Sequence, residues 1–144
     1  MIDNNDTTAI LYDGIGNIDS TIKIIFQNSN IVIVHSSIGI LKNKILYNND
    51  IKLGSKVYWA QPIVTKHSLE LYINSGYVNR ITDRFFYIDK PAIAGGSGSG
   101  IYDKNSELVG ILEGYTEIEQ QKFYTIGAKL DSIKQYLDNV ENIR

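Results

Sequence analysis

The residues with the clearest chemical potential lie in a short run of small residues from Ala92 to Gly100, which reads Ala-Ile-Ala-Gly-Gly-Ser-Gly-Ser-Gly. Glycine reaches positive φ angles, which lets successive backbone N–H groups point toward one spot. Such a spot binds the oxyanion of an attacked carbonyl when a serine hydroxyl lies beside it. Glycine and serine are also the usual composition of a flexible linker. The sequence therefore leaves two interpretations open, a linker or a shaped turn that presents Ser97.

Strand-like segments lie on both sides of this run and would decide how Ser97 is held. Short apolar stretches recur between turn residues at near-regular spacing, which is typical of a barrel or a sandwich. We expect strands at residues 7–12, 20–26, 31–34, 57–60, 69–73, 77–81, 85–88, 101–102, 108–112 and 123–128. Gln61-Pro62 is expected to end the strand at 57–60, and residues 103–106 are expected to form a hairpin turn.

The period of the apolar residues changes near the C-terminus. Leu130, Ile133, Leu137 and Val140 recur at intervals of three or four residues. This spacing puts them on one face of a helix, so we predict an amphipathic helix at residues 130–141. The expected fold class is therefore all-β with one C-terminal helix.

The composition argues against several kinds of site. The chain has no cysteine, and its two histidines, His35 and His67, lie far apart in sequence, so no metal site and no cofactor is expected. A net charge of −2 gives no reason to expect a nucleic-acid partner. The sequence has no run of about 18 apolar residues, so no membrane span is expected. The polar N-terminus does not read as a signal peptide, which favours an intracellular or viral origin.

Several segments match, in order, motifs of one protein family. The sequence resembles the trypsin-like serine proteases, most closely their HtrA/Deg branch. Residues 95–102, Gly-Gly-Ser-Gly-Ser-Gly-Ile-Tyr, look like the family's Gly-Asn-Ser-Gly-Gly-Pro-Leu-Val. Residues 105–111, Asn-Ser-Glu-Leu-Val-Gly-Ile, resemble its Asn-Gly-Glu-Val-Ile-Gly-Ile strand. Weaker matches lie at residues 29–34, 51–60, 75–78 and 126–134, with Asp89 where the family commonly opens the serine loop with an aspartate.

The resemblance implies a double β-barrel with a cleft between the two barrels. Residues 1–144 would form one domain, with a partial first barrel at 1–50, a second barrel at 51–129 and the helix at 130–141. Ser97 matches the nucleophile, and the backbone N–H groups of Gly95 and Ser97 match the oxyanion hole. The strand at Tyr124, Thr125 and Ile126 matches the one that pairs with a bound peptide. A polypeptide substrate or a protein partner would be the ligand.

The match fails where the family needs its proton-transfer residues. Asn30 stands at the position of the aspartate that orients the histidine, and in a trypsin-type triad that exchange lowers kcat by about 10⁴. The family's histidine would fall at or before Met1. Gly96 and Gly100 replace an asparagine and a proline of the family's serine loop. Without an imidazole, a serine hydroxyl is a weak nucleophile.

Two other sources of a base stay open. A compact triad would use His35 as the base, Asp50 as the orienting carboxylate and Ser97 as the nucleophile, in the family's chain order. His35 directly follows a buried-strand pattern, which also fits a structural or surface histidine. His67 follows Pro62 in an expected loop and reads more simply as a solvated side chain. A histidine could also come from another polypeptide.

These observations support three functional hypotheses. The first is a degenerate, non-catalytic relative of the trypsin-like proteases that acts as a structural or binding subunit of a larger assembly. The second is an active serine endopeptidase, completed by His35 or by a histidine from a partner chain. The third is a β-barrel adaptor unrelated to proteases, in which the Gly/Ser run is only a loop.

Overall fold

The computed structural model describes residues 46–64, 69–118 and 122–134, together with the backbone of four short strands before them. The chain divides into two compact units, Met1–Lys44 with Tyr136–Arg144, and Ile45–Gln135. In the first unit, β1 (Leu11–Tyr12) pairs with β2 (Ile18–Asp19), and β3 (Lys23–Gln27) pairs with β4 (Val32–His35). Both pairs are antiparallel. Strands were expected at residues 7–12, 20–26 and 31–34, and β1, β3 and β4 overlap them.

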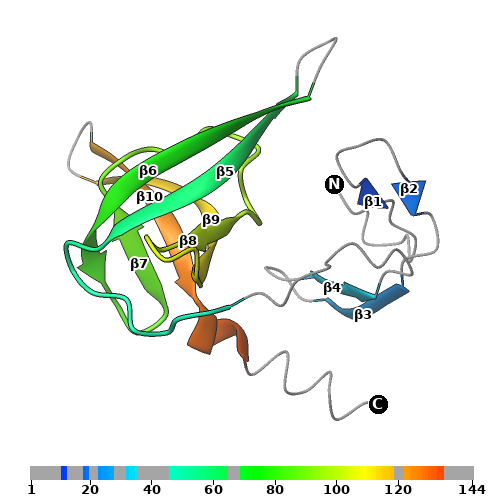
Figure 1. The fold of residues 1–144 in the computed structure, drawn as a ribbon, viewed down its shortest axis with the longest axis horizontal. Helices are drawn as coiled ribbons and strands as arrows, with labels where there is room; N and C mark the ends of the chain where they lie inside the picture. The colour runs from blue at the N-terminus through cyan, green and yellow to red at the C-terminus, as the bar shows by residue number, and fades with distance from the viewer. Residues whose placement is uncertain are drawn as a thin grey trace. The chain divides into compact units, whose positions relative to one another are not determined.

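The second unit is a closed barrel of antiparallel strands (Figure 1). Its order is β10-β7-β6-β5-β8-β9, and the ring closes between β9 and β10. The strands are β5 (Lys56–Val64), β6 (Leu69–Ile81), β7 (Phe85–Ile88), β8 (Gly100–Tyr102), β9 (Leu108–Ile118) and β10 (Lys122–Lys129). A helix begins at Leu130 and is described through residues 130–134. The expected all-β fold with a helix after the last strand is confirmed, and residues 135–141 of the predicted helix lie outside the described residues.

The order of the strands explains where the serine run lies. β5, β6 and β7 follow one another as neighbours, and β8 then returns to lie beside β5. The spatial order β8-β5-β6-β7 is a Greek key, whose fourth strand needs a long connection. Residues 89–99 are that connection, so Ser97 lies on the segment that crosses from β7 to β8.

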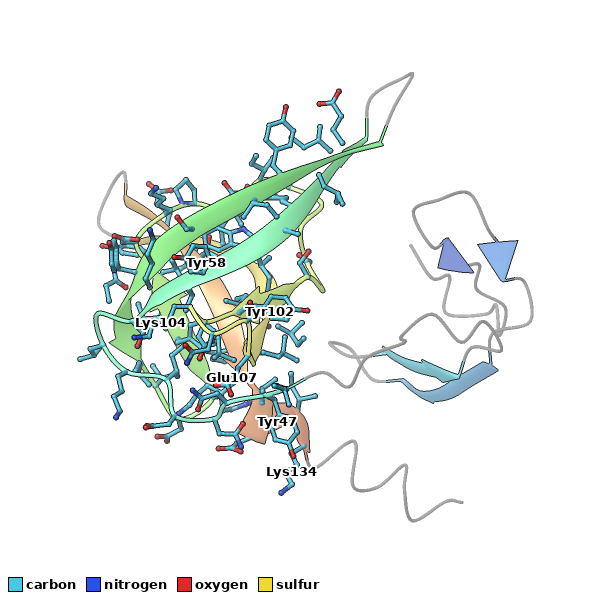
Figure 2. All side chains as sticks on the ribbon, in the orientation of Figure 1. Tyr47, Tyr58, Tyr102, Lys104, Glu107 and Lys134 are labelled. Carbon is cyan, nitrogen blue, oxygen red and sulfur yellow. The ribbon has the colours of Figure 1, made fainter. Side chains whose placement is uncertain are left out.

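Alternation along the strands builds the core. On β5, Val57, Trp59 and Gln61 are buried, while Tyr58 between them is half-buried. Tyr58 and its register partner Tyr102 lie on neighbouring strands β5 and β8 (Figure 2). Successive side chains of a strand point to opposite faces, so these tyrosines lie outside the barrel. The buried apolar residues are Val57, Trp59, Val78, Phe86, Ile88, Ala92, Ile101, Val109 and Leu112.

The long hairpin of β5 and β6 differs from the sequence-based expectation. Gln61-Pro62 does not end β5, which continues to Val64, and residues 69–73 and 77–81 belong to one strand, β6. Proline is tolerated in β5 because β8 pairs with it only at Tyr58 and Trp59, within the described residues, so Pro62 lies at an edge. The far half of the hairpin projects beyond the barrel (Figure 1).

No helix in the described part of the chain has both the length and the apolar character needed to cross a membrane.

Candidate functional site

The serine run is a shaped turn that is bonded to β9. The Gly98 N–H donates to the Leu112 carbonyl at 2.7 Å, and the Leu112 N–H donates to the Ser99 carbonyl at 2.8 Å. Within the turn, the Gly96 N–H donates to the Ile93 carbonyl and the Ser99 N–H to the Gly96 carbonyl. These bonds rule out the interpretation as a flexible linker.

Two glycines of the turn hold backbone angles that other residues rarely adopt. Gly95 has φ of +95° and Gly98 has φ of +91°. Both angles lie in the left-handed region, where a Cβ atom is unfavourable. The run therefore needs glycine at these two positions for its conformation.

Gln61 supports the turn from inside the barrel, and the sequence analysis missed it. Its side chain is fully buried, its Nε2 donates to the Ile93 carbonyl, and its Oε1 accepts a hydrogen bond of 3.1 Å from Asn74. Gly96 packs against it so closely that a Cβ at Gly96 would lie 2.8 Å from Gln61 Nε2. The alternation of Val57, Trp59 and Gln61 would have placed this amide in the core, where it needs partners.

The start of the connection is anchored to two other strands. The Lys90 carbonyl accepts hydrogen bonds from the Thr125 N–H at 3.0 Å and from Thr125 Oγ1 at 2.6 Å. Asp89 bonds to Tyr77 of β6 twice, through its N–H and through its carboxylate, which accepts from the Tyr77 N–H at 2.7 Å. Asp89 is therefore the first residue of the connection that carries Ser97, and its carboxylate is bonded to the backbone of Tyr77.

Backbone donors of the serine run are left over on both sides of Gly96. Among the described residues, no protein group accepts a hydrogen bond from the N–H of Gly95 or of Ser97. Both residues are exposed, and buried Gly96 separates them. These are the two amides that the resemblance assigns to an oxyanion hole. Uncommitted donors on a braced turn can bind a carbonyl oxygen or an anion without a titratable group.

The hydroxyl of Ser97 has a backbone partner. Ser97 Oγ donates to the Glu113 carbonyl at 2.9 Å. The register of β9 and β10 shifts between Ile126 and Gly127, which pair with Gly114 and Leu112, so Glu113 is the extra residue of a β-bulge. The extra residue of a bulge is left out of the ladder, which explains why its carbonyl is free to accept from Ser97.

The residues predicted to act as base or orienting group for Ser97 are far from the serine turn in sequence. Asn30 and His67 lie outside the described residues. His35 is the last residue of β4, in the first unit. Asp50, in the second unit, is exposed and forms an ion pair of 3.0 Å with Lys52. The compact triad of His35, Asp50 and Ser97 stays a prediction.

The strand expected to pair with a peptide has no room for one at its centre. Thr125 pairs with Ile88 of β7 on one side and with Tyr115 of β9 on the other, and Ile126 pairs with Tyr87 and Gly114. Because β10 lies between two strands there, a peptide could pair with it only by displacing one of them. Tyr124 pairs with Thr116 of β9 and with no described residue of β7, and the assignment of Tyr124, Thr125 and Ile126 as the peptide-pairing strand stays a prediction.

The strand next to the serine turn is β9. β8 pairs with β9 from Leu108 to Ile111, and the serine turn then bonds to Leu112 and Glu113. β9 continues past the turn to Ile118. An extended peptide that paired with β9 beyond Glu113 would therefore lie next to the serine turn, which bonds to Leu112 and Glu113.

The titratable groups near the turn include no cluster that would hold a metal ion, as far as the described residues extend. The one described carboxylate with a resolved pKa shift, Asp103, lies in the turn between β8 and β9. Burial raises the pKa of Asp103, but hydrogen bonds from the backbone N–H groups of Glu107 and Asn105 and from Asn48 outweigh burial, so its pKa is lowered. Lys104 and Glu107 of this turn are labelled in Figure 2.

Neither a comparison with models of known protein families nor one with curated proteins gives a match to this sequence.

Proposed function

We propose that this chain is a non-catalytic relative of the trypsin-like serine proteases and serves as the binding subunit of a larger assembly. In this proposal the barrel of β5–β10 is the second barrel of a trypsin-like domain, and the first unit is what remains of the first. The motif matches over residues 20–140 and the closed antiparallel barrel support it. The ligand is an extended segment of polypeptide held beside the serine turn.

The observation that carries the proposal is the hydrogen bond from Ser97 Oγ to the Glu113 carbonyl, at 2.9 Å. A serine hydroxyl has one proton, and here that proton is held by a peptide carbonyl. A peptide carbonyl is not basic enough to remove a proton near neutral pH, so Ser97 stays a neutral hydroxyl. A neutral hydroxyl without a general base is a poor nucleophile.

Binding does not need the base that cleavage needs. The N–H groups of Gly95 and Ser97 are neutral donors, and the buried Gln61 keeps their turn in place. A peptide that pairs with the edge of β9 would gain main-chain hydrogen bonds by β-augmentation. Its carbonyl oxygen, or a terminal carboxylate, would accept from the two amides. The site could therefore bind a peptide and leave it intact.

A serine-reactive fluorophosphonate tests the loss of catalysis. We expect intact-mass analysis of the full chain to show no adduct on Ser97, with Ser97→Ala as the matched control. A stable adduct that is absent from Ser97→Ala would contradict the proposal. Loss of that adduct in His35→Ala, but not in His67→Ala, would identify the compact triad.

The exposure of Ser97 and its two neighbouring uncommitted amides keep an active serine endopeptidase as the second candidate. In that case Ser97 is the nucleophile, and His35 or a histidine from a partner chain is the base. A base from a partner chain predicts fluorophosphonate labelling in the native assembly and none in the isolated chain.

The binding half of the proposal needs its own experiment. A random peptide library displayed on phage is selected against the full chain, and a selected peptide is titrated into the ¹⁵N-labelled protein. We expect the amide resonances of Gly95 and Ser97 to shift, while those of Asn105 and Glu107 stay in place. Shifts confined to other surfaces would contradict a peptide site at the serine turn.

A further inference from the structure

The far half of the β5–β6 hairpin exposes apolar side chains on both of its faces. Leu71 is 68% exposed, Tyr72 is 48% exposed and Ile73 is 73% exposed. Because successive side chains point to opposite faces, these three cannot all be covered from one side. A two-stranded ribbon has little stability of its own, so such exposure needs an explanation.

The backbone of β6 is also open along its outer edge. Tyr77 directs both its N–H and its carbonyl away from β5, toward Asp89. The pairing of β5 with β6 runs without a register shift from Tyr77 to Leu69, so Leu71, Ile73 and Ser75 direct their backbone groups the same way. β7 pairs with β6 only from Val78 onward, and no other described strand pairs with this edge.

The two edges of the hairpin differ in how they are protected. Pro62 lies on the outer edge of β5, where the lack of an N–H blocks pairing with another strand. On β6, residues 69–75 read Leu-Glu-Leu-Tyr-Ile-Asn-Ser, with one charge and no proline. An exposed, apolar and unprotected strand edge is a template for pairing with another chain.

We propose that two copies of this chain pair through the outer edges of β6, antiparallel and around a two-fold axis at Tyr72. This register joins Leu71 to Ile73 of the second copy, and both residues direct their backbone groups outward, so each pair exchanges two hydrogen bonds. The two hairpins then form one four-stranded sheet, which is an isologous dimer. The proposal does not depend on the chemistry of Ser97.

The sequence of β6 is compatible with itself in this register. Apolar Leu71 lies opposite apolar Ile73, and Tyr72 lies opposite Tyr72 of the second copy as an aromatic pair. Glu70, whose carboxylate accepts from the Tyr72 hydroxyl, lies opposite the uncharged Asn74. No like charges meet, and the exposed Leu71 and Ile73 of both copies become neighbours on one face.

Sedimentation equilibrium of the full chain and three variants tests this dimer. We expect the wild-type chain to dimerise in a concentration-dependent way. The double variant Leu71→Lys with Ile73→Lys places lysine opposite lysine and should weaken the dimer by about tenfold or more. The double variant Leu71→Lys with Ile73→Glu places opposite charges together in the same register and should restore it. Leu53→Lys, at a 65% exposed loop position at the opposite end of the hairpin from Leu71 and Ile73, is the matched control and should dimerise like the wild type.

Fluorescence of Trp59, the single tryptophan, shows whether each variant is folded, because this side chain is buried in the barrel. Its emission should be the same in all four proteins. A wild-type chain that stays monomeric at millimolar concentration would overturn the proposal. So would a dimer that both double variants leave unchanged, or one that the mixed-charge variant fails to restore while its Trp59 emission is native.

Discussion

The two connections on either side of β8 differ in how they use their hydrogen-bond donors. Before β8, the serine turn leaves the N–H groups of Gly95 and Ser97 without an acceptor among the described residues. After β8, the turn at residues 103–106 pairs the N–H groups of Asp103, Asn105 and Ser106 within itself, and among the described residues only the N–H of Lys104 has no protein acceptor there. Asp103 accepts from the N–H groups of Asn105 and Glu107, and its own N–H donates to the Glu107 carbonyl at 2.9 Å.

This difference separates a structural turn from a candidate site. An exposed N–H without a protein acceptor can donate to water or to a ligand, so the open donors of Gly95 and Ser97 on a braced turn make it a candidate site. Composition does not reveal the difference, because the glycine and serine of one turn and the asparagine and aspartate of the other all favour turns. What sets the serine turn apart is its support, by Gln61 and Thr125 from the barrel and by Leu112 from β9.

The support of the serine turn gives the largest expected effect. Gln61→Leu removes a fully buried amide together with its two part-buried bonds to Ile93 and Asn74, so we expect a loss of about 2–3 kcal/mol in the free energy of unfolding. Urea unfolding followed by Trp59 fluorescence measures it. Amide exchange should rise at Gly98 and stay unchanged at Glu107. A loss below about 1 kcal/mol would mean that Gln61 does not hold the turn.

The next largest effect is expected where each turn has a residue with a positive φ angle, Gly98 in the serine turn and Ser106 in the second turn. Gly98→Ala forces a Cβ onto a residue with φ of +91° and should cost about 1–2 kcal/mol, although the space around it is open. In the other turn, Ser106 already has φ of 64°, so Ser106→Gly should be neutral or slightly stabilising. Thermal unfolding of the two variants compares them directly. Equal losses in both would contradict the different roles of the two positions.

The carboxylate of Asp103 gives the second turn a pH dependence. Its lowered pKa means that its contribution is present above the pKa of the unfolded chain and is lost as pH falls through the lower pKa of the folded protein. Asp103→Asn should cost about 1 kcal/mol at neutral pH and flatten the acid limb of the stability profile. Urea midpoints between neutral and strongly acidic pH provide the test. An unchanged acid limb would show that Asp103 is not the group responsible.

The smallest effect is expected at Ser97 itself. Its hydroxyl makes one exposed hydrogen bond, so Ser97→Ala should change the free energy of unfolding by less than about 0.5 kcal/mol. The same urea titration measures this variant. A large loss would mean that Ser97 holds the turn together and is not presented by it.

Much of the barrel could be predicted from local pattern. The strand at Phe85–Ile88 and the turn at residues 103–106 were predicted at their observed positions, because each is a short apolar run or turn signal with clear borders. The hairpin of β5 and β6 was not, since Pro62 and Gly76 read as breaks. Pro62 fits within β5 because it lies at an open edge, and Gly76 fits within β6 because it packs closely against Ile88 and Asp89. Both reasons depend on the tertiary structure, which local sequence does not reveal.

The candidate site was predicted in part. The special backbone of the serine turn follows from its glycines, but the sequence pattern predicts the end of a strand at Gln61 and not its role under the turn. Which strand borders the turn depends on the bonds of Gly98 and Ser99 to Leu112, between residues apart in sequence. The bulge at Glu113, which supplies the acceptor for Ser97, has no clear sequence signal either.

Residue-specific hydrogen exchange of the backbone amides tests the account most directly, because it compares the two turns in one sample without any ligand. The account predicts that the N–H groups of Gly95 and Ser97 exchange at nearly the rate of an unstructured peptide, while those of Gly98 and Glu107 are protected by their acceptors. Protection of Gly95 and Ser97 equal to that of Glu107 would show that these donors are already satisfied, and would contradict the proposal that the turn holds them ready for a peptide.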